Sequence, residues 1–388
     1  MTSLSLEHLP LVGYFALIGA LLLTVSPNFA RKPNLIAIVF LALAGGSLFS
    51  TWSYMFAYFQ RSFQDSALRA GIPSANYTTQ AWLADVSLFQ EAWHYVCATP
   101  YRWWWSEQLC LWTTGPLTIL MTIEARRHNI KRAWAFMLLG QVVAISFAQC
   151  LFFAALAVTP ATQAVPRGPP ARALGLHPAQ GKLTWWLLAA VIAANGNVAF
   201  TPHTIFSTTY FLPNLLMMHV VLLAPLSFRD EKAAPMTLSR FYLNIALVAL
   251  RFRLPTVVHL LGDTPKTVSA VLPKLPKIFL KQWEVLNEHP AQQSIGWDVL
   301  FASLSALVYV VWASRSSPRL DERVNPLFIL GAAIATPFVG ISTAAGVILA
   351  LREGKKEVRE DALKKLDDAR KAEALKEMNA LGENKKAR

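Results

Sequence analysis

Charged side chains are scarce in this sequence. They make up 15% of the 388 residues, whereas hydrophobic residues make up 54%; a soluble globular domain has about 25% charged residues. Apolar runs of about 18 to 25 residues recur along the chain, each long enough to cross the roughly 30 Å hydrocarbon core of a bilayer. The composition therefore excludes an ordinary soluble domain and predicts an all-α, polytopic transmembrane helical bundle.

Sequence motifs for nucleotide, metal and serine-hydrolase chemistry are also missing. The chain has no GxSxG, HExxH, P-loop or GxGxxG pattern. An Asp-rich DDxxD motif, which would hold Mg²⁺ in a diphosphate-ionising synthase, occurs on no apolar run; Asp367 and Asp368 lie in the charged tail. We therefore expect no cofactor and no metal, which leaves cofactor-free acid–base chemistry, transport or lipid binding.

Cysteine is rare, and the basic residues are spread out. Cys97, Cys110 and Cys150 are odd in number and lack metal-ligand spacing, so we interpret them as buried apolar residues. The net charge of +13 does not indicate a nucleic-acid partner, because outside the tail the basic residues fall mostly in short loops between apolar runs. That pattern is typical of the positive-inside orientation of membrane proteins.

The apolar runs predict eight to nine spans in residues 1–350, followed by a charged helical tail in residues 351–388. Leu9–Val25 is interpreted as a first span that is retained, and residues 239–260 are the weakest span because Arg251 and Arg253 interrupt them. The candidate spans lie near residues 9–26, 34–58, 104–123, 133–158, 184–201, 206–227, 239–260, 296–314 and 326–350.

The basic loops predict the orientation. Arg31-Lys32 and the cluster at residues 126–132 are two spans apart, so both can be cytosolic. With nine spans the N-terminus and the glycosylation sequon at Asn76 are then lumenal and the tail is cytosolic. We expect a multi-pass protein of the endoplasmic reticulum, with the tail as a candidate docking segment for pathway enzymes.

Two connectors predict amphipathic interfacial helices. Trp82–Val96 has Asp85, Phe89 and Trp93 at a spacing of four residues. The connector 261–295 carries several lysines among apolar residues, which suits a segment that lies on anionic lipid.

Three carboxyl groups near the expected lumenal interface are candidate catalytic acids. Glu107 would lie about one turn inside a helix that starts at Trp103, where burial would keep it protonated for general-acid catalysis. Glu91 could approach it because Pro100 turns the chain back, and Asp85 is the third candidate. The alternatives are structural: Glu107 paired with Arg102, Glu91 solvated on a polar helix face, and Asp85 at a helix start.

Aromatic side chains surround these acids. Trp52, Tyr54, Trp93, Trp103 and Trp104 are candidate walls of a substrate pocket, since indole faces stabilise a nearby cation. An interfacial aromatic belt is the alternative. Three consecutive Trp residues cannot all face lipid, so at least one ring should point into the bundle.

Several longer motifs resemble a known family. The runs Thr51–Phe63, Ser87–Trp93, Arg102–Cys110, Glu124–Arg127 and Leu139–Ser146 resemble fungal membrane-bound terpene cyclases of the ascofuranone and ascochlorin type. The resemblance covers about residues 34–160, and the remainder only by hydropathy. It implies a meroterpenoid isomerase or lyase that protonates the epoxidised farnesyl chain of a prenylated aromatic polyketide. It does not identify the acid or the ring formed.

Other classes stay open. A transporter or receptor for a small apolar molecule would have broken spans at matching places in two halves, and the sequence shows no such repeat. A small lipid isomerase also places an acidic group beside aromatic side chains, but it has about half as many spans. A scaffold that recruits soluble enzymes through its tail is the third alternative.

Overall fold

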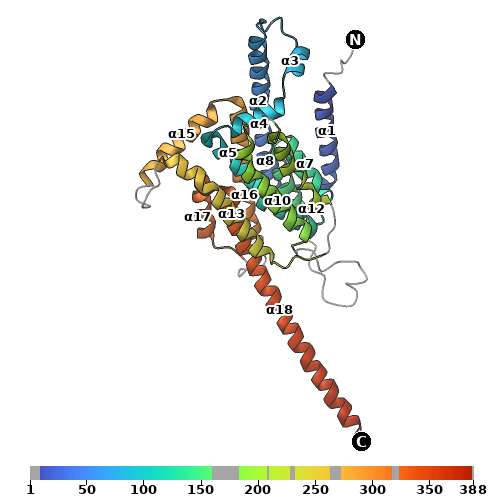
Figure 1. Cartoon of the computed structure of the whole chain (residues 1–388). Coiled ribbons are helices and arrows are strands. Elements are labelled where there is room, and N and C mark those ends of the chain that lie inside the picture. The colour runs from blue at the N-terminus through green and yellow to red at the C-terminus, as the bar shows by residue number, and fades with distance from the viewer. Residues whose placement is uncertain are drawn as a thin grey trace.

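The computed structural model describes residues 9–159, 183–207, 209–227, 232–262, 272–316 and 323–386, and these residues form a helical bundle (Figure 1). A single isolated bridge, Thr184 with Ala233, is the only strand-like pairing within them. The helices are α1 Leu9–Val25, η2 Ser26–Phe29, α2 Leu35–Arg69, α3 Thr79–Asp85, α4 Leu88–Cys97, α5 Pro100–Trp112, η3 Thr113–Leu117, α6 Thr118–His128, α7 Ala133–Val142, α8 Ile145–Val158, α10 Trp185–Thr204, α11 Phe211–Val220, α12 Leu223–Ser227, α13 Leu238–Leu261, η4 Leu272–Lys274, α15 Leu275–Asn287, α16 Pro290–Arg315, α17 Pro326–Val339 and α18 Ile341–Lys386.

Four helical segments are long and apolar enough to cross a membrane: Leu11–Phe29, Leu35–Arg69, Leu238–Leu261 and Pro290–Arg315. The predicted all-helical class is confirmed, and the segments are compatible with a membrane protein. Helix α13 continues through both arginines that made 239–260 the weakest predicted span. The predicted count of eight to nine is not reproduced, because several other apolar runs are broken into shorter helices.

The segment α5–η3–α6 forms the centre of the bundle. Every residue from Trp103 to Ala125 is buried, and α10, α13, α16 and α18 pack around it. Thr99 caps α5, and Pro100 occupies the first turn, where its missing N–H is not needed. A single π-turn follows at Thr113–Leu117, where Pro116 cannot donate a backbone hydrogen bond.

Residues 133–158 fold back as a helical hairpin instead of forming the single span that was predicted. Asn28 exchanges hydrogen bonds with the Lys131 backbone, through its amide nitrogen at 3.1 Å and its amide oxygen at 2.9 Å. Asn34, six residues later, donates to the Ala157 carbonyl at 2.7 Å. The two ends of the segment therefore lie at the same end of the bundle, and its tip at Val143 and Ala144 lies inside.

A carboxyl group from another helix stabilises this turn. The first N–H groups of α8 have no partner within the helix, and the Asp298 carboxyl of α16 accepts those of Ile145 at 3.0 Å and Ser146 at 2.7 Å. Asp298 lies more than two turns into α16, which starts at Pro290, so its carboxyl serves the start of α8 and not the first turn of its own helix.

The predicted span 326–350 is also a hairpin. Helix α17 ends at Val339, Gly340 adopts a positive φ of 79° that L side chains rarely take, and α18 returns. Both ends of the hairpin lie together, because Lys355 donates to the Arg323 carbonyl at 2.7 Å. Helix α18 then runs without a break across the predicted domain boundary at residue 350 and leaves the body of the bundle (Figure 1).

A buried cluster of charges joins α18 to α6. Arg127 donates to both carboxyl oxygens of Glu353, at 2.9 and 2.6 Å, and to Glu124 at 2.9 Å. Arg352 contacts Glu124 at 3.0 Å, and Lys356 contacts Glu353 at 2.9 Å. Burial alone would raise the pKa of Glu353, but the neighbouring Arg127 and Lys356 lower it to about 2. The cluster therefore holds its two carboxylates in the charged form.

Helices α4 and α15 lie at the opposite end of the bundle from the exit of α18 (Figure 1). Helix α15 buries Ile278, Val285 and Leu286 and exposes Phe279 and Trp283, as expected for an amphipathic interfacial helix. Residues 263–271 of the same predicted connector lie outside the described residues.

The predicted glycosylation site and the cysteines have clear positions. Asn76 is exposed in the loop between α2 and α3, and its sequon partner Thr78 caps α3. Cys97, Cys110 and Cys150 are free and buried, as the sequence predicted.

Candidate functional site

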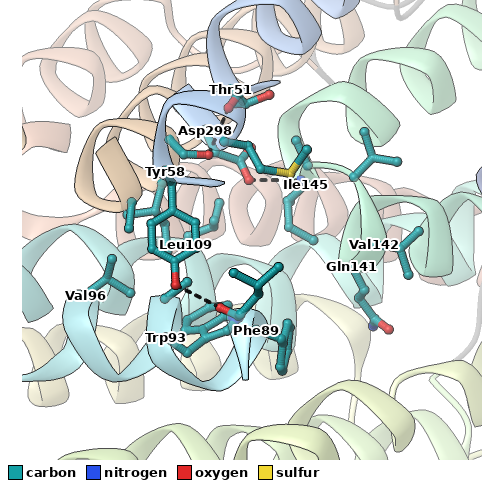
Figure 2. Close-up of a pocket in the computed structure, with 18 of the residues that line it drawn as sticks. Thr51, Tyr58, Phe89, Trp93, Val96, Leu109, Gln141, Val142, Ile145 and Asp298 are labelled. Carbon is teal, nitrogen blue, oxygen red and sulfur yellow. Dashed lines mark hydrogen bonds between the residues drawn. The ribbon is translucent and has the colours of Figure 1, made fainter. Parts of the chain in front are cut away.

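The main cavity has a volume of about 720 Å³ and is bounded by α1, α2, α3, α4, α5, α11, α16 and the tip of the α7–α8 hairpin. Its walls are mostly apolar, with Met55 and Phe59 from α2, Phe89 and Val96 from α4, and Leu109 from α5. Cavities of this size and character hold drug-sized apolar ligands. Figure 2 shows this cavity.

One end of the main cavity carries a carboxyl group. Asp298 is 7% exposed and lies between Thr51 and Ile145 (Figure 2). Two N–H groups of α8 and the Ser146 side chain hydrogen-bond to this carboxyl and fix its orientation. A carboxylate has about four acceptor positions, so capacity for a ligand remains. Ser294, one turn before Asp298, also lines the cavity and donates to the Thr51 carbonyl at 3.0 Å.

Aromatic side chains line another part of the cavity. Tyr58 donates its hydroxyl to the Leu88 carbonyl at 3.1 Å, which joins α2 to the start of α4. Trp93 and Phe89 extend from α4 on the side of the view away from Asp298 (Figure 2), with ring centroids 6.4 Å apart. Of the five predicted substrate-binding aromatics, Trp93 is the one that lines the main cavity.

A histidine and a glutamine form a second polar region. His219 of α11 and Gln141 of α7 both line the cavity, and Gln141 donates its side-chain amide to the His219 backbone carbonyl at 3.2 Å. The His219 ring lies 6.1 Å from the Trp93 ring. His219 therefore contacts the end of α7, whereas Asp298 contacts the start of α8.

Glu107 lies in a different place from the other predicted acids. It is 3% exposed, lines a second cavity of about 460 Å³ together with His203 and His259, and pairs with Arg253 at 3.2 Å. The Arg253 guanidinium stacks 3.6 Å from the Trp104 ring centroid. The structural alternative considered from the sequence, a pair with Arg102, is not formed.

Arg102 has another carboxylate partner. It contacts Glu288 at 2.7 Å, which joins the start of α5 to the connection between α15 and α16. Arg102 also lies 3.8 Å from the Tyr95 ring centroid. The Glu288 side-chain hydrogen bond with Arg102 lowers the pKa of this carboxyl.

Glu91 and Asp85 lie on the exposed surface. Glu91 accepts the Ser87 N–H at 2.9 Å and faces out of α4 beside Arg102. Asp85 forms an ion pair with Arg69 at 3.4 Å, with about half of each side chain exposed. The structure does not bring Glu91 and Glu107 to one aromatic wall, because α4 turns its Trp93 face inward and its Glu91 face outward.

The remaining predicted aromatics occupy three environments. Trp103 lines the second cavity, and Trp104 lies beneath Arg253. Trp52 packs against Phe15 at a ring distance of 5.8 Å, and Tyr54 is half-buried on α2. Neither of the last two lines the main cavity.

The polar residues of the main cavity were not singled out as site residues from the sequence. Among them are His219 and Asp298. A weak signal existed for both, since ionisable residues inside apolar runs are costly and usually functional. Within the described residues, no group of three or more His, Cys, Asp and Glu side chains is placed to hold a metal ion.

Comparison of the chain with protein-family models, with curated proteins and with solved structures finds no match. The function therefore has to be inferred from the chemistry of the site.

Proposed function

We propose that this protein is a membrane terpene cyclase that protonates an epoxidised farnesyl chain of a prenylated aromatic substrate and cyclises it. The observation that carries the proposal is the main cavity: an apolar, aromatic-lined chamber of about 720 Å³ with a single buried carboxyl group, Asp298, at one end. The sequence resemblance to fungal membrane-bound terpene cyclases supports the same reaction. The expected products belong to meroterpenoid secondary metabolism.

Asp298 is the candidate acid in this cavity. In the proposed step its proton moves to the epoxide oxygen while one carbon–oxygen bond of the epoxide opens. An alkene of the same chain attacks the carbon that becomes electron-poor, and a carbon–carbon bond forms. The final cation either loses a proton to a base or is captured by a hydroxyl group of the substrate, which then releases its own proton. One proton is returned for the one donated, so the product is an isomer of the substrate.

The side chains that line the cavity would stabilise the cation, exclude water from it and hold the chain in a folded conformation. Indole and phenol faces such as those of Trp93 and Tyr58 stabilise a nearby positive charge, and the apolar side chains exclude water from the cation. A fixed cavity also holds the chain in a folded conformation, which removes part of the entropic barrier. A positioned general acid contributes roughly 10²–10⁴-fold in rate.

The test is to incubate membranes containing the full-length protein with an epoxidised farnesyl-phenol, without added nucleotide or metal. We expect an isomer of unchanged mass, and turnover at least about 100-fold slower in Asp298→Asn. Asp85→Asn is the matched control, because this carboxyl is exposed on α3, and it should retain normal turnover.

Asp298 also stabilises the start of α8, so the experiment needs a second variant. Asp298→Glu keeps a carboxyl group and should retain more activity than Asp298→Asn at equal amounts of folded protein. Normal turnover in folded Asp298→Asn would remove this residue from the mechanism. Glu107 in the second cavity would then be the acid to test, and Glu91 would follow.

The charge distribution supports an orientation in the membrane. The end of the bundle where α18 leaves carries Arg31, Lys131 and the Arg127 cluster, and the opposite end carries Asn76. By the positive-inside rule the α18 end is cytosolic and Asn76 is lumenal, so Asn76 is available for glycosylation in the endoplasmic reticulum. With both hairpins returning, we propose seven passes, formed by α1, α2, α5–α6, α10, α11–α12, α13 and α16.

Transport or binding of a small apolar molecule is the second candidate function. The observation that favours it is the pair of helical hairpins at 133–158 and 326–350, since transporters often build substrate sites from interrupted helices. The same incubation separates the two functions: retention of the farnesyl-phenol without conversion would favour binding or transport.

A further inference from the structure

A buried pair of serine hydroxyls leads to the Asp298 carboxyl from the side away from the cavity. Ser47 of α2 and Ser146 of α8 are both fully buried, and their Oγ atoms lie 2.6 Å apart. The Ser146 side chain in turn hydrogen-bonds to the Asp298 carboxyl of α16. The three helices pack against one another, so this chain of hydrogen bonds joins elements that are far apart in the sequence.

Ser146 contacts Asp298 in two separable ways. Its backbone N–H donates to the carboxyl at 2.7 Å, beside that of Ile145 at 3.0 Å, and these two bonds stabilise the start of α8. They would form with any residue other than proline at position 146, because they use only the main chain. The Ser146 hydroxyl adds a third donor to the same carboxyl, which the stability of the turn does not require.

The direction of the hydrogen bonds follows from the number of protons. Each hydroxyl donates one hydrogen bond and accepts up to two. Ser146 is the partner that the described residues offer the Ser47 hydroxyl, and a buried proton without an acceptor is costly. Ser47 therefore donates to Ser146, which leaves the Ser146 proton for Asp298. This direction suits a carboxylate, which only accepts hydrogen bonds.

The proposed reaction creates such a carboxylate. When the proton of Asp298 moves to the epoxide oxygen, negative charge develops on a carboxyl that borders an apolar cavity, where an unpaired charge is costly. Hydrogen bonds to charged groups are stronger than those between neutral groups. The bond from Ser146 therefore strengthens as the proton leaves, and interactions that strengthen in the transition state raise kcat.

We propose that Ser146 and Ser47 are positioning residues that stabilise the Asp298 carboxylate as this group gives its proton to the substrate. The effect on turnover rests on the proposed function, whereas the chain of hydrogen bonds to Asp298 does not. No proton passes along the pair: the two hydroxyls only donate hydrogen bonds. The inference adds to the site two residues that are not among those lining the main cavity.

The first test separates kcat from KM in membranes supplied with the epoxidised farnesyl-phenol. Ser146→Ala should lower kcat roughly tenfold and change KM less than about twofold, because the lost hydroxyl does not contact the substrate. Ser47→Ala should lower kcat less, since it acts through Ser146. Ser53→Ala is the matched control, an exposed serine of α2 that donates to the Phe49 carbonyl of its own helix, and both constants should stay unchanged.

A second pair of variants keeps the test valid if Ser146→Ala disturbs the packing. Ser146→Thr and Ser146→Val have nearly the same shape, so any damage from the added methyl group is shared, and only the threonine keeps a hydroxyl. At equal amounts of folded protein the valine variant should turn over roughly tenfold more slowly than the threonine variant. Equal rates in the two variants would overturn the inference.

Infrared spectroscopy of the purified full-length protein in detergent tests the hydrogen bonds without turnover. The C=O stretch of protonated Asp298 is identified as the band that is lost in Asp298→Asn. Loss of a hydrogen-bond donor stiffens the C=O bond, so Ser146→Ala should shift this band to higher wavenumber and Ser53→Ala should not. An unmoved band in folded Ser146→Ala, or a wild-type protein without the band, would overturn the inference.

The combined results distinguish this inference from the proposed function. A band shift with unchanged kcat in Ser146→Ala would overturn the positioning role, although the epoxide is still converted. A band shift that depends on Ser146, without conversion of the epoxidised probe by the wild-type protein, would leave the chain of hydrogen bonds to Asp298 intact and refute the cyclase proposal.

Discussion

Substitution of Glu353 by Gln tests how the C-terminal helix is held to the bundle. Among the described residues, the cluster contains three cations, Arg127, Arg352 and Lys356, and two carboxylates, Glu124 and Glu353. Glu353→Gln keeps the size of the side chain but leaves three buried cations with a single carboxylate. Removing one partner of a buried ion pair costs about 3–5 kcal/mol.

Substitution of the cationic partner, Arg127, should destabilise the protein less than substitution of Glu353. The order of these two effects is the informative result. Arg127→Gln breaks the two hydrogen bonds to Glu353 at 2.9 and 2.6 Å, yet it leaves two cations with two carboxylates. We therefore expect Glu353→Gln to destabilise the protein more than Arg127→Gln. An argument from the number of these hydrogen bonds alone predicts similar losses, because Arg127 donates three of them and Glu353 accepts three.

Thermal unfolding of the purified protein in detergent measures the difference. For domains of 150–250 residues, 1 kcal/mol changes Tm by about 2–4 °C; the lower figure gives a decrease of roughly 6–10 °C for Glu353→Gln in this longer chain. Glu360→Gln, at an exposed position of the same helix, is the control and should change Tm by less than about 1 °C. An Arg127→Gln decrease equal to or larger than that of Glu353→Gln would refute the charge-balance reasoning.

The pH dependence gives the same prediction an independent check. The folded-state pKa of Glu353, about 2, is below its ordinary value of 4.5. Its contribution to stability is therefore fully present above about pH 4.5 and is lost as the pH falls toward 2. The wild-type Tm should decrease over this range more steeply than the Tm of Glu353→Gln.

Three further changes have definite expected outcomes. Glu107→Gln should lower Tm by several degrees, because it leaves the Arg253 charge buried without its partner; an unchanged Tm with lost turnover would favour catalysis by Glu107. Gly115→Ala should also lower Tm, since an added Cβ would lie 2.7 Å from Ile245 Cγ2, and Ile245→Ala in the same chain should restore part of the loss. Asn76→Gln should abolish a glycosidase-sensitive mass shift in microsomes, and a wild-type protein without that shift would contradict a lumenal, glycosylated Asn76.

The local features of the fold could be predicted from the sequence. The apolar runs identified the helices, and the turn at Pro100 is where the sequence placed it, since proline fits the first turn of a helix and stops the preceding one. Trp93, a predicted pocket wall, lines the main cavity, although the helix predicted over Trp82–Val96 is divided into α3 and α4 at Val86 and Ser87. These properties depend on neighbours within a few residues, which a sequence shows directly.

The two hairpins could not be predicted in the same way. Val142, Val143 and Ala144 contain no helix breaker, and the turn depends on Asp298, more than 150 residues later. Pro337 and Gly340 did signal the second turn, but an apolar run of the right length favoured a span. Hydropathy measures whether a segment prefers lipid to water. It does not measure whether the segment crosses the membrane or turns back within it.

The assignment of the candidate acids from the sequence has the same limit. Glu107 was placed correctly as a buried carboxyl, but its partner, Arg253, lies on a helix whose arginines had made it the weakest predicted span. Each of the two residues is costly inside a bilayer alone, and together they form an ion pair. Neither residue's role can be assigned without the other.

The hairpin at 133–158 has a consequence for experiments that map membrane topology. Truncated proteins fused to a reporter after residue 158 would lack α16, and with it the Asp298 carboxyl that accepts the first N–H groups of α8. Without that acceptor, the mostly apolar segment of 26 residues is long enough to insert as one continuous helix. A truncation series would then place the reporter on the wrong side of the membrane, whereas a tag inserted into the complete chain would report the native side. If truncation fusions and the inserted tag disagree at this segment, the hairpin turn at 133–158 depends on α16, which is synthesised later.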